Sequence, residues 1–195
     1  MTSMLSKKHS FDSVFDSQKV FRLILEAVSN PARIVNISEY AEKLFGDQPA
    51  FLAVAVTLLD NEVSFNTCEN YSLSDEIALL TLAKREKNES ADFVFVCNPD
   101  NIKNVVERAK YGTLADPHKS ATIIIKNDDA PVCRLTFSGP GIDGQIKVRA
   151  TQTIKNTIVL RDAQNYEYPQ GIDFIFISRV GELLAIPRLT QMEVD

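Results

Sequence analysis

The sequence predicts an α/β domain in which helices cover both faces of a mixed β-sheet, a three-layer α/β/α architecture. Helical patterns alternate with short apolar strands through the first part of the chain, and strand–turn–strand patterns dominate its last part. The length of 195 residues suits one domain with a substantial core. We therefore expect residues 1–195 to form a single domain.

The first predicted helix follows a polar segment, residues 1–12, which we expect to be flexible. The run Ser13-Val14-Phe15-Asp16 has the spacing of a capping box. Behind it, apolar residues recur at helical spacing, and Pro31 should end the helix at or before Asn30. This apolar stripe consists of Val20, Phe21, Ile24, Leu25 and Val28.

Strand and helix patterns then alternate up to residue 110. The run 49–59 fits either a buried strand or a helix, and Pro49 in a first turn favours the helix. Asn98-Pro99-Asp100 is typical of a helix start, and that helix should run to about Lys110. The other expected elements are strands at 32–37, 62–67 and 92–97, a loop at 38–48 and a helix at 72–87.

Strands and turns dominate the remainder. Two strands should be joined by a connection of hairpin length, Asn127 to Pro131, and a turn-rich corner at 139–144 should precede a third strand. Residues 151–163 have helical spacing, although β-branched residues weaken the pattern. The expected elements are a loop at 111–119, strands at 121–126, 132–138 and 145–149, and a helix at 151–163.

The closing segment is a strand, a tight turn and a second strand, residues 172–187. Gly181 sits where the turn requires a positive φ. Pro187 lacks an N–H, so it should stop the second strand and mark a sheet edge. Asp173 heads the first strand, and Arg188, just past the second, is its natural ionic partner.

Composition excludes several functions. The net charge of −5 and the pI of about 5.1 argue against sequence-independent binding of nucleic acid, which needs a basic face. No apolar run is long enough to cross a membrane, and no secretory signal is apparent. The odd number of widely spaced cysteines, Cys68, Cys97 and Cys133, predicts reduced core residues of a cytoplasmic protein.

Motifs of known chemistry are few. His9 and His118 lack partners at metal-ligand spacing, so we expect no metal site. No phosphate-binding glycine motif and no nucleophile elbow occurs. Gly139-Pro140-Gly141 precedes a strand and is best read as a structural corner.

Several short motifs, taken in their order along the chain, nevertheless resemble those of a known protein family. The chain resembles the PhnH-type subunits of the bacterial carbon–phosphorus lyase system, roughly collinearly over most of its length. Ala32 stands where that family commonly has Gly, and Val28 where it has Met, so a positive φ at residue 32 would be strained. The matching segments are Asp16-Ser17-Gln18 with Phe21-Arg22, Ser29-Asn30-Pro31, Thr57 to Asn61, Gly112-Thr113, Pro117, Ala121-Thr122, Leu135-Thr136, Gly139 to Ile142, and the closing hairpin through Val194.

The resemblance implies a fold, a function and partners. The fold would be similar to the large-domain core of pyridoxal-phosphate (PLP)-dependent transferases, without bound PLP. The chain would be a homodimeric, cytoplasmic subunit that works with PhnG-, PhnI- and PhnJ-type partners. It would support the transfer of an organophosphonate onto the ribose of a nucleoside triphosphate, without an autonomous active site. Exposed apolar positions on the first helix would supply subunit contacts.

Two other interpretations stay open: a small phosphonate or nucleotide transferase with its own phosphate pocket around Arg188 and Thr113, and an unrelated α/β binding module. An arginine can bind phosphonate or phosphate oxygens through paired hydrogen bonds, but structural ion pairs outnumber ligand sites. The candidate ligand or interface residues, all on matching segments, are Arg22, Asp60, Thr113, Thr122, Asp173 and Arg188.

Overall fold

The computed structural model describes residues 9–194. Part of the segment expected to be flexible, residues 1–8, lies outside them. Within the rest of that segment, the Ser10 N–H donates to the Lys43 carbonyl at 2.9 Å, and His9 Nδ1 accepts from the Phe45 N–H at 3.0 Å. Among the described residues no helix is long and apolar enough to cross a membrane.

The centre of the fold is a seven-stranded mixed sheet in the order β1-β9-β8-β5-β4-β2-β3. Five neighbouring strands, β8 to β3 in that order, run parallel, and β9 runs antiparallel to both of its neighbours. The strands are β1 (Ile34–Asn36), β2 (Ser64–Asn66), β3 (Lys84–Arg85), β4 (Phe93–Val96), β5 (Thr122–Lys126), β8 (Asp173–Ile177) and β9 (Glu182–Ile186).

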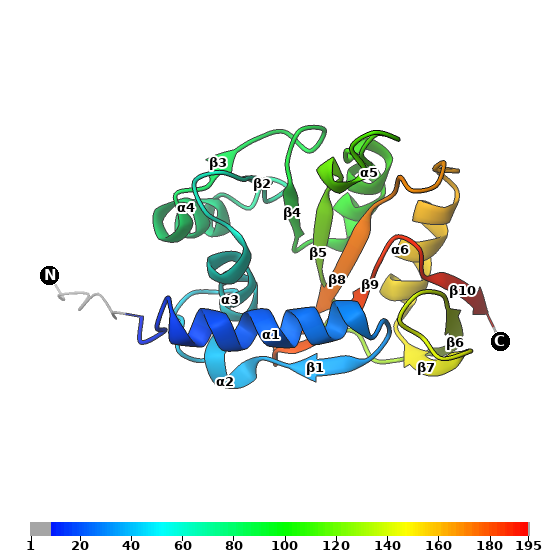
Figure 1. The fold of residues 1–195 in the computed structure, drawn as a ribbon. Helices are drawn as coiled ribbons and strands as arrows, with labels where there is room; N and C mark the ends of the chain where they lie inside the picture. The colour runs from blue at the N-terminus through cyan, green and yellow to red at the C-terminus, as the bar shows by residue number, and fades with distance from the viewer. Residues whose placement is uncertain (1–8, 195) are drawn as a thin grey trace, which may run out of the picture.

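Helices cover both faces of this sheet, as the sequence predicts. One face packs on α1 (Phe15–Ser29), α3 (Pro49–Leu58) and α4 (Tyr71–Thr81). The other packs on α5 (Ile102–Arg108) and α6 (Gln152–Asp162). Figure 1 shows α3 and α4 to the left of the central strands and α5 and α6 to the right. The α/β class with a mixed sheet is therefore confirmed.

A second, smaller sheet lies beside α6 (Figure 1). Its strands are β6 (Cys133–Ser138), β7 (Ile146–Ala150) and β10 (Gln191–Val194), all antiparallel, in the order β10-β6-β7. Leu135 and Phe137 of β6 are buried in the same core as α5 and α6. The small sheet thus completes the cover over that face of the large one.

Two sequence predictions about strands and turns are wrong, and one strand was not predicted. The strands at 121–126 and 132–138 do not form a hairpin, because β5 and β6 belong to different sheets. Pro187 does not mark a sheet edge, because β9 lies between β1 and β8. After Pro187 the chain leaves the large sheet and supplies β10 to the small one, a strand that the sequence pattern did not indicate.

Two helix predictions also need correction. The segment 38–48 contains a short helix, α2 (Ser38–Ala41), where a loop was expected. The helix expected at 72–87 ends at Thr81, because Leu82 adopts a left-handed φ of 61° and the next residues form β3 beside β2. The run 49–59, in contrast, is the predicted helix, and Ala50 to Ala55 are all buried.

The start of α1 is capped one residue earlier than predicted. Asp12 Oδ1, not the Ser13 side chain, accepts hydrogen bonds from the N–H groups of Val14 and Phe15, both at 2.8 Å. In turn, Asp16 Oδ2 accepts a hydrogen bond from the Asp12 N–H at 2.8 Å. Reciprocal capping of this kind satisfies donors that have no partner within the helix.

Only part of the predicted apolar stripe of α1 faces the core. Val20 and Ile24 are buried, whereas Phe21, Leu25 and Val28 are 48%, 51% and 41% exposed. Phe21, Leu25 and Val28 follow at spacings of four and three residues, so they form one exposed row along the helix. We call these three residues the α1 row.

Candidate functional site

The predicted Asp173–Arg188 pair lies at the amino end of β8. Asp173 Oδ1 accepts from the Arg188 backbone N–H at 2.8 Å and from its Nε at 3.2 Å, and Asp173 Oδ2 pairs with Nη2. The side chains of Asp173 and Arg188 are only 29% and 18% exposed. A paired contact in a partly desolvated setting fixes the base of the hairpin.

Nη1 and Nη2 of Arg188 also donate to groups other than Asp173. Nη1 donates to the Pro117 carbonyl at 2.7 Å, and Nη2 donates to Ser120 Oγ at 2.5 Å. The guanidinium therefore ties the β8–β9 hairpin to residues 117–120, which lead into β5. A phosphate or phosphonate would have to displace these partners before Arg188 could bind it.

A second ionic cluster lies at the same sheet edge, ahead of β2 and β4. Asp92 Oδ2 accepts from the N–H and Oγ of Ser64 at 2.7 and 2.6 Å, and Asp92 Oδ1 pairs with Lys110. Burial raises the pKa of Asp92, but the hydrogen bonds from Lys110 and Ser64 outweigh it, so the net pKa is lowered. These contacts join the starts of two strands to the end of α5.

Two further candidates, Thr122 and Thr113, lie near this amino edge and form hydrogen bonds with neighbouring groups. Thr122 is the register partner of Asp173 across β5 and β8, and its N–H donates to the Asp92 carbonyl at 2.9 Å. Thr113 Oγ1 accepts the Asp116 N–H at 2.9 Å within the exposed loop that precedes β5. Asp173, Arg188 and Thr122 are thus brought together, with Thr113 in the adjoining loop.

Arg22 and Asp60 lie apart from that edge. Arg22 is exposed on α1, next to Phe21 of the α1 row. Asp60 is exposed after α3, where its Oδ1 accepts the Glu62 N–H at 2.9 Å in a turn. The six sequence candidates therefore do not form one site.

Sequence reasoning missed the opposite, carboxyl edge of the sheet. The turn after β2, residues 66–70, contains two consecutive non-glycine residues with left-handed backbone, Cys68 at φ 50° and Glu69 at φ 68°. Such backbone is costly and persists only where its surroundings enforce it. An available signal was the polar run Asn66-Thr67-Cys68-Glu69-Asn70 directly after a strand of the parallel sheet.

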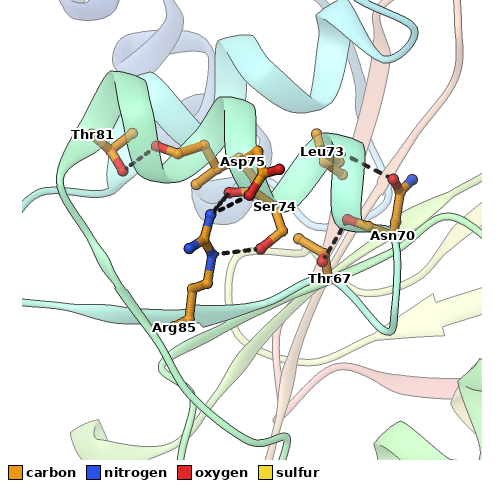
Figure 2. Close-up of polar contacts among 8 residues, drawn as sticks. Thr67, Asn70, Leu73, Ser74, Asp75, Thr81 and Arg85 are labelled. Carbon is orange, nitrogen blue, oxygen red and sulfur yellow. Dashed lines mark hydrogen bonds and ion pairs between the residues drawn. The ribbon is translucent and has the colours of Figure 1, made fainter.

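Hydrogen bonds hold this turn from several sides. Asn66 Oδ1 accepts the Cys68 N–H at 2.8 Å, and Asn66 Nδ2 donates to the Glu86 carbonyl at 2.5 Å. Thr67 Oγ1 donates to the Asn70 carbonyl at 2.9 Å, and Asn70 Oδ1 accepts from Leu73 N at 3.1 Å, which caps α4 (Figure 2). The strained backbone is therefore firmly held.

Two hollows flank this turn. One, of about 350 Å³, lies beside α4, where Figure 2 shows Arg85 of β3 reaching Ser74 and Asp75. Arg85 bonds Ser74 Oγ at 2.9 Å and Asp75 Oδ1 at 2.6 Å, so its charge is neutralised. The other, of about 300 Å³, is lined by Asn66, Cys68, Glu69, Lys87, Asn88, Glu89, Asn101 and Asn104, and we call it the amide hollow.

The cysteines are half-buried rather than fully buried, and none of the three forms a disulfide. Burial raises the pKa of the Cys68 thiol to about 12, with Cys97 and Glu69 nearby adding to the shift. Burial also raises the pKa of Cys97. These thiols stay protonated near neutral pH, which makes them poor nucleophiles.

The described residues offer few groups that could bind a metal ion or a cofactor. Among residues 9–194 no cluster of His, Cys, Asp and Glu could hold a metal ion. A PLP ring needs a carboxylate at its nitrogen, and Asp173, the residue most easily taken for that group, is bound to Arg188. The residues present at that edge therefore do not fit PLP.

Comparison with known proteins places the chain in a family. A family model described as bacterial phosphonate metabolism protein (PhnH) matches residues 9–193. The chain is 27% identical over 180 residues to the proposed C-P lyase subunit protein HtxG of Stutzerimonas stutzeri, covering 91% of this chain and 86% of that protein.

A second relative is the alpha-D-ribose 1-methylphosphonate 5-triphosphate synthase subunit PhnH of Rhizobium meliloti (strain 1021). It is 27% identical over 187 residues, which cover 93% of this chain and 92% of the relative. The family model spans nearly the whole chain, as the ordered motifs of the sequence predict. The chain belongs to the PhnH family of bacterial phosphonate metabolism proteins.

Proposed function

We propose that the chain is a non-autonomous subunit of a carbon–phosphorus lyase core complex. In this role it supports the transfer of an organophosphonate onto the ribose of a nucleoside triphosphate. The observation that carries the proposal is the family match over residues 9–193, together with two relatives whose names both include the word subunit.

The name of the second relative defines the chemistry of the proposed reaction. Its product carries methylphosphonate at C1 of ribose and triphosphate at C5. In the proposed step a phosphonate oxygen forms a bond to C1, the C1–N bond breaks, and the base leaves with the bonding electrons. Such a step needs charge stabilisation at the phosphonate and at the departing base.

The ionic groups of this chain support an accessory role. Arg188 spends its donors on Asp173, Pro117 and Ser120, and Lys110 is paired with Asp92. Neither cation is free to neutralise a phosphonate. We therefore assign catalysis to the assembled complex, with PhnG-, PhnI- and PhnJ-type subunits as the proposed partners in the cytoplasm.

The α1 row is the proposed contact face, either with a second copy of the chain or with another subunit. Its three residues are 41% to 51% exposed, and the exposed Arg22 lies next to Phe21 and three residues before Leu25 on the same helix. Subunit interfaces combine an apolar centre with arginine more often than other surfaces do. A homodimer formed through this row is part of the proposal.

We also propose that the fold derives from the large-domain core of PLP-dependent transferases without retaining the cofactor. The seven-stranded mixed sheet with helices on both faces supports this descent. The pairing of Asp173 with Arg188 supports the loss of PLP binding.

Co-expression with the partner subunits tests the proposal. The chain should co-purify with them, and release of base from nucleoside triphosphate and methylphosphonate should require the whole assembly. Replacing Phe21 and Leu25 by Glu should abolish co-purification or dimerisation, because two charges would enter the apolar contact. The matched control is Leu79→Glu, at an exposed apolar position of α4 outside the row.

The rival small transferase makes the opposite prediction. Turnover by the isolated chain with nucleoside triphosphate and methylphosphonate would refute the accessory role. The family match over residues 9–193 already excludes an unrelated binding module, and failure to co-purify with any lyase subunit would refute the accessory role.

A further inference from the structure

The amide hollow lies where α/β sheets commonly bind ligands. β3 is on one side of β2 and β4 is on the other, so the chain reverses its direction of progress across the sheet at β2. The helix after β2, α4, packs on one face, and the helix after β4, α5, packs on the opposite face. A crevice opens at such a point outside the carboxyl ends of the strands.

The lining residues lie at or just after the carboxyl ends of these strands. Asn66 ends β2 and Cys68 follows it, Asn88 follows β3, and Asn101 and Asn104 follow β4. Asn101 Nδ2 donates to the Cys68 carbonyl at 3.3 Å, which links the start of α5 to the strained turn. Segments distant in the sequence are thus held around one hollow.

The hollow is polar but has little net charge. Lys87 and Glu69 offset each other, and Glu89 is paired with Arg108 at 3.0 Å. The remaining lining is dominated by side-chain amides, each of which can both donate and accept hydrogen bonds. A neutral ligand with several hydroxyl groups matches this lining better than a phosphate does.

One side-chain amide of the lining could accept a hydrogen bond from a ligand. Asn88 Oδ1 is buried, and no residue described by the structure donates to it. An unmet buried acceptor costs stability and calls for an explanation. Ser17 Oγ and Thr190 Oγ1 are also buried without a partner among the described residues, but of the three residues only Asn88 lines the amide hollow. Together with the consecutive strained residues Cys68 and Glu69, the unmet acceptor of Asn88 marks this hollow as more than a structural turn.

We propose that the amide hollow binds the sugar ring of a nucleoside through its hydroxyl groups. The inference rests on the proposed function only for the choice of sugar, since a ribose is the acceptor of that reaction. The chemistry itself comes from the lining: uncharged amides around a hollow of about 300 Å³, open to solvent at the sheet edge.

Direct titration of the full chain with adenosine and with 2′,3′-dideoxyadenosine tests the proposal. Adenosine should bind and the dideoxy compound should bind at least about tenfold more weakly, because sites built for hydroxyls reject analogues that lack them. Equal binding of the two compounds, or no binding of adenosine at millimolar concentration, would overturn the proposal.

Asn88→Leu separates a binding role from a structural one. Because no residue among 9–194 donates to Asn88 Oδ1, the substitution should leave the melting temperature unchanged or raise it, yet weaken adenosine binding about tenfold. Asn156→Leu, at an exposed position of α6 away from the hollow, is the matched control and should bind normally. Unchanged adenosine binding by Asn88→Leu would count against the proposal.

The proposed function is tested by a separate measurement. Co-purification with the lyase subunits does not depend on the amide hollow. A chain that assembles but does not distinguish adenosine from its dideoxy analogue therefore refutes the sugar site alone, and a chain that binds adenosine without assembling refutes the accessory role alone.

Discussion

The two edges of the large sheet differ in how their polar groups are used. At the amino edge, Asp173, Arg188 and Asp92 satisfy one another or the backbone through short contacts. At the carboxyl edge, the turn after β2 holds strained backbone beside a hollow lined by Asn88, whose buried Oδ1 receives no hydrogen bond from the described residues. A network that is closed on itself stabilises the fold, whereas one left open can bind a ligand.

This difference bears on how the sequence is interpreted. A charged pair at the base of an apolar hairpin attracts attention because charges are rare beside buried strands. The sequence favours a structural ion pair there, and the contacts of Asp173 and Arg188 with each other and with neighbouring groups are compatible with that interpretation. The less conspicuous amides after β2, β3 and β4 lie where a ligand could enter.

The largest effect is expected at the amino edge. Arg188→Ala should lower the free energy of unfolding by about 2–3 kcal/mol, because it removes the donor to Asp173, Ser120 Oγ and the Pro117 carbonyl. The loss should be somewhat smaller than for a fully buried ion pair, since both side chains are partly exposed. Arg85→Ala, which breaks a pair exposed by 54% and 80% at the other edge, should cost less than about 1 kcal/mol. Urea unfolding of both variants measures the difference, and equal losses would contradict the contrast between the edges.

Acid should also act through the amino edge. The folded pKa of Asp92 is below its ordinary value of 3.8, so the unfolded chain binds this proton more readily than the folded one. The stabilisation is complete above about pH 5 and is lost as the pH falls through the lowered folded pKa.

At pH 7 Asp92→Asn should therefore be less stable than the parent chain, and its stability should decline less steeply in acid. Urea unfolding between pH 3 and pH 7 tests this. Lys110→Met is the companion variant and should reduce the acid dependence similarly, because it removes the cation that Asp92 contacts. An unchanged slope in both variants would show that Asp92 does not carry the effect.

The sequence predicts the layers of the fold better than its connections. A proline at a first turn and the helix preference of Ala and Leu identify α3, although a strand was an alternative for the same residues. The hairpin of β8 and β9 follows from Gly181, whose φ is 80°. A Cβ added at this position would lie only 2.6 Å from Ser38 N, so a larger residue would not fit. These features depend on local residues, so local patterns reveal them.

The connections depend on distant partners. β3 has only two residues and exists because Lys84 and Arg85 pair with Ser64 and Phe65 of β2. β10 exists because β6 offers it an edge. The amide hollow needs three separate strand ends, so no single segment contains its pattern. For the same reason the motifs in the sequence identified the family of the chain but did not indicate this hollow.

Strain offers a smaller contrast between the edges. Ala32, at the amino edge, has φ 67°, and its N–H donates to the Ala185 carbonyl at 3.1 Å. Ala32→Gly should stabilise the fold by about 0.5–1 kcal/mol, because Gly adopts a positive φ without a Cβ clash. Ala27→Gly in α1, where the backbone is helical, is the matched control and should lose about 1 kcal/mol. Thermal unfolding measures both, and a loss at residue 32 would contradict the strain argument.

Glu69→Gly makes the same change at the carboxyl edge and gives the smallest expected effect on stability. Glu69 is exposed at φ 68°, so Gly should gain about 0.5 kcal/mol. Unlike Ala32→Gly, it should also weaken adenosine binding by about threefold, because a more flexible turn must be ordered again when the ligand binds. Strain that serves only the fold can be removed without loss, whereas strain that shapes a binding site is removed at the expense of affinity. Calorimetric titration of both glycine variants decides between these roles, and equal affinity for adenosine would assign the turn after β2 to the fold alone.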